Sequence, residues 1–432
     1  MRDLLVAFIV FGSLPFVLKR PFWGIVLLAG LGYMNPHRLC YGFMLTMPVV
    51  QIVAITTLIG MLRSKEQKRI VWSREVWILL IFVAWMAVTT TQAVYFTPAV
   101  DQLEKVVKIQ ILTFMTLLML TSRERVHILI WTIVVSLGFY GIKGGVFTIA
   151  HGGVYRVQGP SGTFIGGNNE LALALVMTIP LMRYLQFHES SWWIRRGLVA
   201  AMLLTAIAAI GSQSRGALVA LVITGSFFWW KSRNKFGTAL LLGIVVLGVA
   251  TIMPPEWYAR MNTIESYDQD ESAIGRLNAW RTAWNVANSR VFGAGFEMWR
   301  DYVFALYSPD PGNVRDAHSI YFKVLGEHGW IGFALFMALL AATWLKCGRI
   351  GRIAKGHPEL AWARDLAAMI RVSMIGYMSA GAFLGLSYFD YIYHLIAIVV
   401  VVHQLVLNES RSQTAQAPQP AALSLFGALK LI

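Results

Sequence analysis

The residues best placed to do chemistry lie in the run from Ala317 to Gly332, which reads Ala-His-Ser-Ile-Tyr-Phe-Lys-Val-Leu-Gly-Glu-His-Gly-Trp-Ile-Gly. A long polar stretch ends here and a long apolar stretch begins, so His318 lies where the chain enters an apolar environment. We expect Asp316 to cap the following helix and His318 to lie in its first turn, where the positive helix end disfavours a charged imidazole. A neutral imidazole can take a proton from a hydroxyl group, so His318 is a candidate general base. The alternative is an ordinary hydrogen-bonded histidine.

Three cations stand out because they lie in apolar or glycine-rich surroundings. Arg215 lies in Gly-Ser-Gln-Ser-Arg-Gly-Ala, a tight connection between two apolar runs, and Arg156 lies in a glycine-rich stretch. Lys143 lies inside an apolar run. A cation inside or at the surface of a membrane is costly unless it meets an anion, so each is a candidate anion ligand. The alternatives are lipid headgroups for Arg156 and an ion pair with Glu170 or Asp390 for Lys143.

A second cluster lies in the polar stretch, within Ile-Gly-Arg-Leu-Asn-Ala-Trp-Arg-Thr-Ala-Trp-Asn. Arg276, Trp280, Ala283 and Trp284 recur at helical spacing and share one face, whereas Arg281 lies roughly 140° round from Arg276. This pattern predicts an amphipathic helix along the membrane surface, with Arg276 and Arg281 as candidate substrate ligands. The alternative is ordinary packing of the indoles against the ends of the membrane helices.

Composition decides the fold class. The chain is 57% hydrophobic and 14% charged, with a mean hydropathy of +0.59, which excludes a soluble globular protein. Apolar runs long enough to be helices predict an all-α polytopic membrane protein of about 12 transmembrane helices. The first two runs are short, so the number is 12 or 13. The runs are 3–18, 21–34, 41–62, 76–95, 104–120, 126–149, 167–187, 195–211, 216–230, 236–253, 319–346, 367–386 and 391–407.

The net charge of +15 does not indicate nucleic acid, because lysine and arginine are concentrated in alternate loops. Short loops of the other set contain only Arg156 and Arg215, and the 254–317 loop has six Arg, no Lys and nine Asp or Glu. The positive-inside rule makes the cationic loops cytoplasmic and the 254–317 loop external. The C-terminus is then inside, as is the N-terminus if the first two runs form one unit. We expect a bundle over 1–253, a helical periplasmic loop over 254–317, further membrane helices over 318–408 and a flexible tail over 409–432.

The pattern His-Ser/Asn, seven residues, then Glu-x-Gly-x-x-Gly resembles the Wzy_C family of O-antigen ligases and polymerases, over roughly residues 200 to 345. The resemblance implies a GT-C-type enzyme of the bacterial inner membrane with its active site facing the periplasm. It implies transfer of a preassembled glycan from undecaprenyl diphosphate to an acceptor hydroxyl on lipid A-core or a glycoprotein. The mechanism would be inverting, without metal or other cofactor. In this family an Arg shortly before a Trp, and then a Gly-x-Gly, precede the His motif. Here these are similar to Arg276, Trp280 and Gly293-Ala-Gly295, which assigns Arg276 to diphosphate binding.

The resemblance also orders the remaining candidates. His318 would activate the acceptor while Arg215 and Arg276 hold the departing diphosphate through forked hydrogen bonds. Nine residues after His318, Glu327 would project roughly 180° away on a straight helix, so we expect Glu327 to fix packing with Gly329 and Gly332. Asp316, Ser319, Tyr321 and Trp280 complete the supporting set. Ser319 stands where many ligases have Asn, and the run looks most like the O-glycosylation ligase branch.

Several alternatives remain open at this point. A polymerase or a protein O-oligosaccharyltransferase of the same family would use the same residues. A metal-dependent transferase would use the acid cluster Glu265, Asp268, Asp270 and Glu271, which we expect to be a solvated surface. A flippase or transporter of the lipid-linked glycan would need the cations and membrane lipids but no general base.

Overall fold

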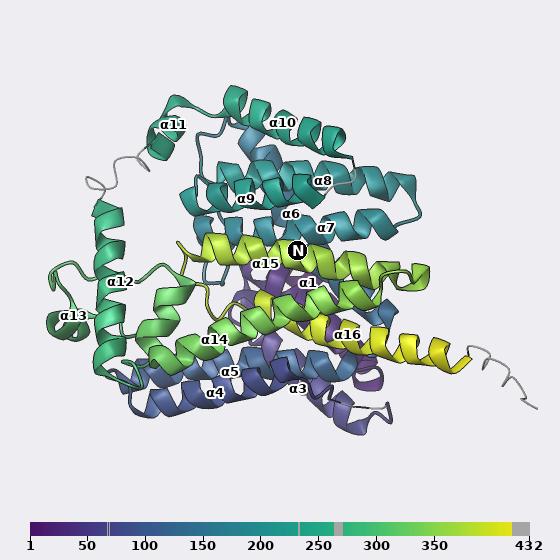
Figure 1. Cartoon of the computed structure of the whole chain (residues 1–432), viewed down its shortest axis with the longest axis horizontal. Coiled ribbons are helices and arrows are strands. Elements are labelled where there is room, and N and C mark those ends of the chain that lie inside the picture. Colours follow the sequence, from purple (N-terminus) through teal and green to yellow (C-terminus); the bar gives the residue numbers. More distant parts are fainter. Residues whose placement is uncertain (67, 69, 232–233, 263–270, 417–432) are drawn as a thin grey trace, which may run out of the picture.

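The computed structural model describes residues 1–66, 68, 70–231, 234–262 and 271–416, and over these residues it is helical without a strand (Figure 1). Each apolar run predicted from the sequence corresponds to a helix. These helices are α1 (Arg2–Lys19), α2 (Phe22–Met34), α3 (Val49–Arg63), α4 (Arg74–Thr91), α5 (Phe96–Met119), α6 (Arg123–Ala150), α7 (Asn168–His188), α8 (Trp192–Gly211), α9 (Arg215–Lys231), α10 (Lys235–Ile252), α14 (Ile320–Ile353), α15 (Ala361–Gly381) and α16 (Asp390–Gln416).

Six of the described helices are long and apolar enough to cross a membrane: α4, α6, α7, α8, α14 and residues 390–411 of α16. Shorter apolar helices include α2, α3 and most of α9. The polar stretch of the chain forms α11 (Pro255–Asn262), α12 (Glu271–Ser289) and α13 (Asp301–Tyr307). The expected membrane protein is therefore confirmed at the level of an all-helical chain with several membrane-spanning helices.

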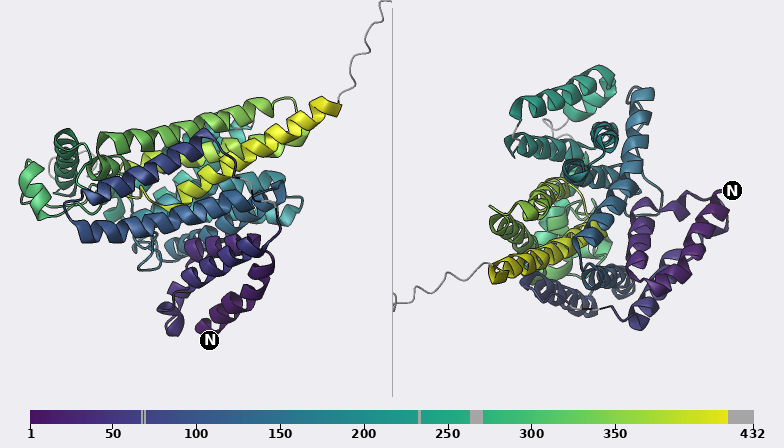
Figure 2. Two further views of the ribbon diagram at one scale, coloured as in Figure 1. Left: turned by 90° about the horizontal axis from the view of Figure 1, so that it is seen from below. Right: turned by 90° about the vertical axis from the view of Figure 1, so that its right-hand side faces the viewer.

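Among the N-terminal helices, α1 and α2 match the predicted runs, whereas α3 begins later than predicted. Asp3 accepts hydrogen bonds from the backbone of Gly42 and Met44, and the backbone at Val17 and Leu18 touches Gly60. Thus α1 runs in the same direction as α3 and packs directly on it, and the N-terminal helices lie on one flank of the bundle (Figure 2). The predicted helix over 41–62 begins only at Val49, after two 3-10 turns, because Pro48 has no N–H for an earlier turn.

At the other terminus α16 continues to Gln416, past the predicted start of the tail at 409. Residues 417–432 lie outside the described part of the chain. The two cysteines, Cys40 and Cys347, are both buried and unpaired.

The loops that connect the helices lie at the two ends of the bundle, where polar contacts join them to one another. At one end, the connections that carry most of the cations meet: Arg125 pairs with Glu66 at 2.8 Å, His127 approaches Glu189, and His188 approaches Asp365. We call this the cation-rich end. At the opposite end, the backbone at Val94 bonds to Ala294, and Gln213 bonds to the carbonyl of Gly153. We call this the His318 end, and α12 crosses it at a steep angle to the long helices (Figure 1).

Small residues let the helices approach within the bundle. Gly141 lies against Thr205, Gly144 against Ala208, and Gly145 against the backbone of Leu204, so α6 and α8 pack closely. At the cation-rich end a buried ion pair between Lys346 and Glu75 joins α14 to α4. Side chains of α7 and α16 fill the centre of the bundle.

The grouping of the loops predicts opposite accessibility for the two ends. In Ala305→Cys and Lys355→Cys, the new thiol lies at an exposed position of the His318 end and of the cation-rich end, respectively. We expect a membrane-impermeant maleimide to label position 305 but not 355 in intact cells, because lysine and arginine favour the cytoplasmic side. The buried native cysteines keep the background low. Labelling of 355 but not 305 would reverse the orientation.

Candidate functional site

The helix that carries the His318 motif is broken at Gly329. Gly329 has φ 67° and ψ −172°, which divides α14 into a short segment, 320–328, and a long one, 330–353. A β-carbon at Gly329 would lie 2.3 Å from the carbonyl oxygen of Val291, so the backbone of residues 291–293 fills the space beside the break. Glycine is required here because other residues are strained in this conformation.

The break leaves carbonyl groups of α14 without a hydrogen-bond partner in the helix. A neighbouring segment donates hydrogen bonds to them. Ala294 and Gly295 donate their N–H groups to the carbonyls of Gly326 (3.0 Å) and Glu327 (2.9 Å). The indole of Trp85, on α4, donates to the carbonyl of His328 at 2.9 Å. Gly293 and Gly295 both have positive φ, which explains why Gly-Ala-Gly stands at this place. The motif glycines on both sides thus form one backbone junction.

His318 lies outside the helix, which corrects the expected capping. Its φ is +42°, α14 begins at Ile320, and Ser319 holds the N-cap position. Asp316 is therefore not the cap, because the left-handed turn at His318 separates it from the helix. The imidazole is half-exposed, and its Nδ1 lies 3.9 Å from Oδ2 of Asp316. The side chain is reachable from the His318 end of the bundle, as a general base must be.

A chain of charges connects Asp316 to the buried Glu327. Oδ1 of Asp316 lies 3.3 Å from Nζ of Lys323, and Nζ lies 3.6 Å from Oε1 of Glu327. The premise of a straight helix through His318 is wrong, because His318 precedes α14. Its conclusion holds among the described residues: His318 and Glu327 do not contact each other directly, and Asp316 and Lys323 lie between them. Glu327 is fully buried, as a packing role requires, and is also part of this chain.

Glu327 is held in turn by two neutral donors. The hydroxyl of Tyr388 donates to Oε2 at 2.6 Å, and the indole of Trp299 donates to Oε1 at 3.2 Å. Burial and the nearby Glu327 carboxylate raise the pKa of Tyr388 well above its ordinary value, so its hydroxyl stays protonated and can donate. The adjacent His328 is buried and bonds Thr89 at 2.6 Å, in agreement with a structural role.

The amphipathic helix α12 packs beside His318. The indole of Trp280 donates to the carbonyl of Ala317 at 2.7 Å and stacks on Phe322 at 4.8 Å. Trp284 meets Trp330 edge to face. Both contacts follow the alternative in which the indoles pack against the membrane helices. Arg276 lies one turn before Trp280, and Gly275 packs on the side chain of Arg315. Arg281 lies on another face and is exposed.

Arg215 reaches the same end on the first turn of α9. Gln213, with φ 58°, makes the tight turn, and Ser214 accepts a hydrogen bond from the N–H of Ala217. A β-carbon at Gly216 would lie 3.2 Å from Cβ of Phe383, in the connection between α15 and α16. Two residues further along that connection, a β-carbon at Gly385 would lie 3.0 Å from Oδ2 of Asp316. Residues 380–385 therefore lie between the Arg215 turn and the His318 segment.

Arg156 is attached to the Arg215 turn, whereas Lys143 lies on the exposed side of α6. The guanidinium of Arg156 donates to the side chain of Gln213 at 3.3 Å. Lys143 is exposed on the side of α6, and among the described residues it forms no ion pair with Glu170, Asp390 or any other acid. Its neighbours Gly144 and Gly145 face the bundle, so the helix turns Lys143 outward. The ion pair that was the alternative role for Lys143 is therefore absent from the described part of the chain.

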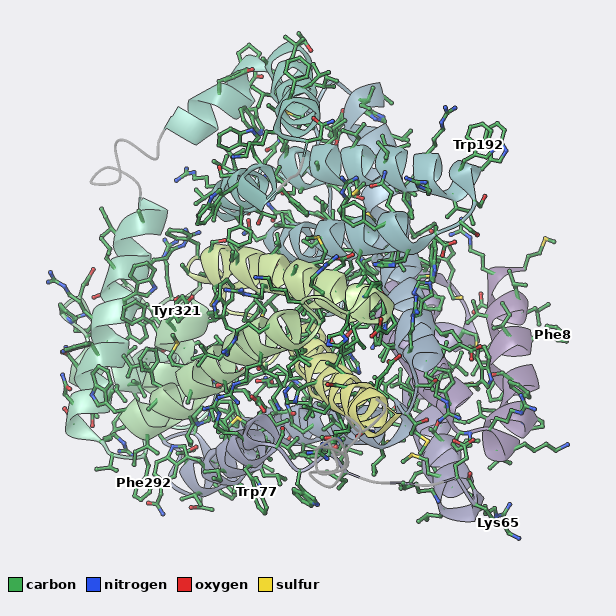
Figure 3. The ribbon with its side chains drawn as sticks, turned by 45° about the vertical axis from the view of Figure 1, so that its right-hand side comes forward. Phe8, Lys65, Trp77, Trp192, Phe292 and Tyr321 are labelled. Atoms are coloured by element: carbon green, nitrogen blue, oxygen red, sulfur yellow. The ribbon has the colours of Figure 1, made fainter. Side chains whose placement is uncertain are left out.

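Of the two remaining supporting residues, Tyr321 is half-buried and Ser319 is buried. Tyr321 donates to the carbonyl of Met378 at 2.9 Å, between α14 and α15 (Figure 3). Ser319 is 1% exposed, and its hydroxyl has no hydrogen-bond partner among the described residues. Of the acid cluster, Glu265, Asp268 and Asp270 lie outside the described residues.

With this geometry in place, the comparisons with known proteins fall on the same segments. Residues 200–337 match the family model described as O-antigen ligase. The matched range begins in α8 and ends in α14, so it includes Arg215, Arg276, the Gly-Ala-Gly junction and His318. Residues 1–190, which include Lys143 and Arg156, match a family of unknown function. A search of curated proteins finds no match.

The sequence did not single out three contact residues of this site: Lys323 and Trp299, inside the range that matches the O-antigen ligase model, and Tyr388, outside it. Lys323 stood in the motif and is four residues before Glu327, a spacing at which a helix brings opposite charges together. That signal was available. Tyr388 and Trp299 come from distant parts of the chain, and no local pattern relates them to Glu327.

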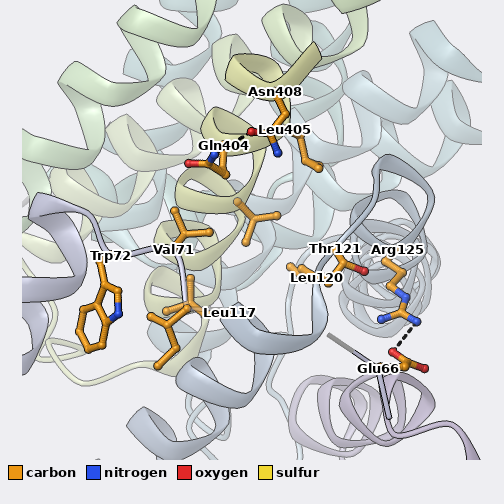
Figure 4. Close-up of a pocket in the computed structure, with 12 residues that line it drawn as sticks. Glu66, Val71, Trp72, Leu117, Leu120, Thr121, Arg125, Gln404, Leu405 and Asn408 are labelled. Carbon is orange, nitrogen blue, oxygen red and sulfur yellow. Dashed lines mark hydrogen bonds and ion pairs between the residues drawn. The ribbon is translucent and has the colours of Figure 1, made fainter. Parts of the chain in front are cut away.

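A pocket of about 810 Å³ lies at the cation-rich end, away from the His318 end (Figure 4). The Arg125–Glu66 pair borders it, and the C-terminal part of α16 forms one wall. No sequence-predicted site residue lines this pocket. Its lining includes Trp72, Leu117, Leu120, Thr121, Gln404, Leu405 and Asn408.

The break in α14 predicts a large difference between two glycines of that helix. Gly329→Ala should lower stability by at least about 1–3 kcal/mol, the cost of a non-glycine residue in such a conformation. Gly348→Ala is the matched control, because nothing lies within 4 Å of the added methyl group and alanine favours a helix. Thermal unfolding of the purified protein in detergent measures both. Equal melting temperatures for the two variants would contradict the assigned break.

Proposed function

We propose that this protein is a glycosyltransferase that moves a preassembled glycan from undecaprenyl diphosphate to an acceptor hydroxyl at the periplasmic face of the inner membrane. The acceptor that we favour is lipid A-core. The observation that carries the proposal is the position of His318: half-exposed, outside the helix, beside Asp316, and within the range that matches the O-antigen ligase model.

In the proposed reaction the acceptor hydroxyl attacks the anomeric carbon from the face opposite the diphosphate. His318 takes the hydroxyl proton, the new carbon–oxygen bond forms, and the bond to the diphosphate oxygen breaks with inversion. Undecaprenyl diphosphate departs with the bonding electron pair. The bond between the anomeric carbon and the diphosphate, which breaks in this step, supplies the free energy of the reaction, so the step needs no nucleotide.

Arginines are suited to the leaving group because its negative charge grows as the glycosidic bond breaks. A guanidinium binds phosphate oxygens through two parallel hydrogen bonds and stays charged at any relevant pH. We propose that Arg215 and Arg276 hold the diphosphate and that Arg156, attached to the Arg215 turn, adds positive charge at its edge. The N-terminus of α9 adds its own positive end at Arg215. These groups supply the positive charge in a metal-independent mechanism.

A second function has the same cations but no general base. A flippase for lipid-linked glycan would bind the diphosphate at the arginines and release it unchanged. The Asp316 carboxylate beside His318 favours the transferase, because a transport path for an anion gains nothing from an acid at this point. A polymerase or a protein O-oligosaccharyltransferase would differ from the ligase only in the acceptor.

Removing the imidazole should separate chemistry from binding. We expect His318→Ala to lower transfer from undecaprenyl diphosphate-linked O-antigen units to lipid A-core by about 10²–10⁴-fold, the usual effect of losing a general base. Binding of undecaprenyl diphosphate alone should stay within a few-fold, measured by thermal shift. His357→Ala, an exposed histidine at the cation-rich end, is the control and should transfer normally. Normal transfer by His318→Ala would remove His318 from the chemistry.

Keeping the charge but removing the fork should test the arginines. Arg215→Lys and Arg276→Lys should each lower transfer by about tenfold or more, equivalent to ~1.4 kcal/mol of transition-state stabilisation. Arg281→Lys, on the exposed face of α12, should have at most a small effect. If both site variants transfer glycan at the normal rate while binding undecaprenyl diphosphate normally, the bidentate role is wrong.

A further inference from the structure

The charges behind His318 are arranged as a sequence of contacts that ends in the bundle core. Asp316 uses its two oxygens differently: Oδ2 faces Nδ1 of His318 at 3.9 Å, and Oδ1 faces Nζ of Lys323 at 3.3 Å. An oxygen that is held by a cation cannot rotate freely, so the position of Oδ1 fixes the position of Oδ2. The orientation of Asp316 therefore depends on Lys323.

Lys323 is itself held from the other side. Its side chain is 13% exposed, and Nζ lies 3.6 Å from Oε1 of Glu327, one helical turn further into the bundle. Glu327 is completely buried and receives hydrogen bonds from Tyr388 and Trp299. Those residues come from the connection before α16 and from the segment before α13, so three separate parts of the chain fix this carboxylate. Gly385, in the connection between α15 and α16, packs against Asp316: a β-carbon there would lie 3.0 Å from Oδ2 of Asp316.

Burying this lysine and glutamate costs free energy of folding, so the presence of the pair calls for a functional explanation. A lysine and a glutamate taken out of water lose hydration that their mutual attraction only partly restores, and an apolar pair of similar size often gives equal or greater stability. The bundle has such a pair at its other end as well, between Lys346 and Glu75. The pair at Lys323 differs because it extends to a half-exposed histidine through a third charged group.

We propose that Lys323, anchored by Glu327, is a positioning residue that orients the Asp316 carboxylate toward His318 during glycan transfer. This inference rests on the proposed role of His318 as the base. As His318 takes the proton of the acceptor hydroxyl, its ring becomes a cation, and the nearby Asp316 carboxylate stabilises that charge. The negative charge stays on Asp316 and the proton stays on His318. Lys323 exchanges no proton and does not touch substrate.

The mechanism has a specific consequence for combined substitutions. If Lys323 acts on the reaction only through Asp316, its removal has no further effect once the Asp316 carboxylate is gone. A structural role would instead add its own loss to any other. A double-mutant cycle measures the difference.

The test uses the full-length protein in detergent, with undecaprenyl diphosphate-linked O-antigen units as donor and lipid A-core as acceptor. The variants are Asp316→Asn, Lys323→Met/Glu327→Gln and the combination of all three substitutions. Removing Lys323 and Glu327 together avoids leaving a buried charge without its partner. Lys323→Arg keeps the cation. The control is Glu104→Gln/Lys108→Met, which removes an exposed glutamate–lysine pair at the same four-residue spacing on α5.

We expect Asp316→Asn and Lys323→Met/Glu327→Gln each to lower kcat at least about tenfold, with the KM for the donor within about twofold. The combination should be no slower than Asp316→Asn alone, Lys323→Arg should keep most of the rate, and the α5 control should be normal. Losses that multiply in the combination, or a normal kcat for Lys323→Met/Glu327→Gln, would overturn the positioning role.

The same experiment separates this inference from the proposed function. His318→Ala is measured in parallel under the same conditions. An inactive His318→Ala together with normal Lys323 variants contradicts the positioning role alone. A His318→Ala that still transfers glycan contradicts the proposed general base, and with it the reason for the positioning role.

Discussion

An apolar bundle has no water to pair with a free backbone carbonyl, and this constraint organises the site. The break at Gly329 exposes the carbonyls at the end of the first segment of α14, and each needs a donor. Ala294, Gly295 and Trp85 supply those donors, which brings the segment after α12 and the helix α4 to one junction. Once that segment is fixed, α12 is fixed beside the start of α14, and Trp280 reaches the carbonyl of Ala317. The position of His318 therefore depends on backbone hydrogen bonds about three helical turns away.

The break in α14 also explains why charged residues are tolerated at the His318 end of the bundle. A continuous helix would carry Glu327 into the apolar interior with only lysine as a partner. At the junction, Glu327 meets Trp299 and Tyr388, whose neutral donors satisfy oxygens that an ion pair alone would leave short of partners. Charge, backbone junction and aromatic donors thus occur together because each makes the others less costly. The half-exposed pair of His318 and Asp316 lies at the outer limit of this cluster.

Much of the fold could be predicted from the sequence because its signals are local. Apolar runs of sufficient length give the helices, and the alternation of cationic loops anticipates the two ends at which the connections meet. The chemical motif and its glycines also predicted a functional segment at 317–332, inside the region that matches the O-antigen ligase family. These inferences need only composition, periodicity and the resemblance of a short pattern.

The rest depends on conformation and on contacts between distant residues. The left-handed conformation at His318 is uncommon for any residue other than glycine, so the sequence pointed to a continuous helix capped by Asp316. The outward direction of Lys143 follows from glycines that pack α6 against α8, and a helix position alone does not say which side faces the bundle. The contacts of Glu327 with Tyr388 and Trp299 join segments far apart in the chain. The start of α3 at Val49 reflects a proline inside an otherwise apolar run.

The proposed function requires the His318 end to bind the diphosphate of a lipid-linked glycan and to hold it beside the His318 imidazole. The most direct measurement is an electron cryomicroscopy structure of the protein with undecaprenyl diphosphate bound. We expect forked hydrogen bonds from Arg215 and Arg276 to phosphate oxygens, with the His318 imidazole facing the terminal phosphate, where the anomeric carbon of a donor would lie. Phosphates held at the cation-rich end, or at the His318 end without either arginine, would contradict the proposed function.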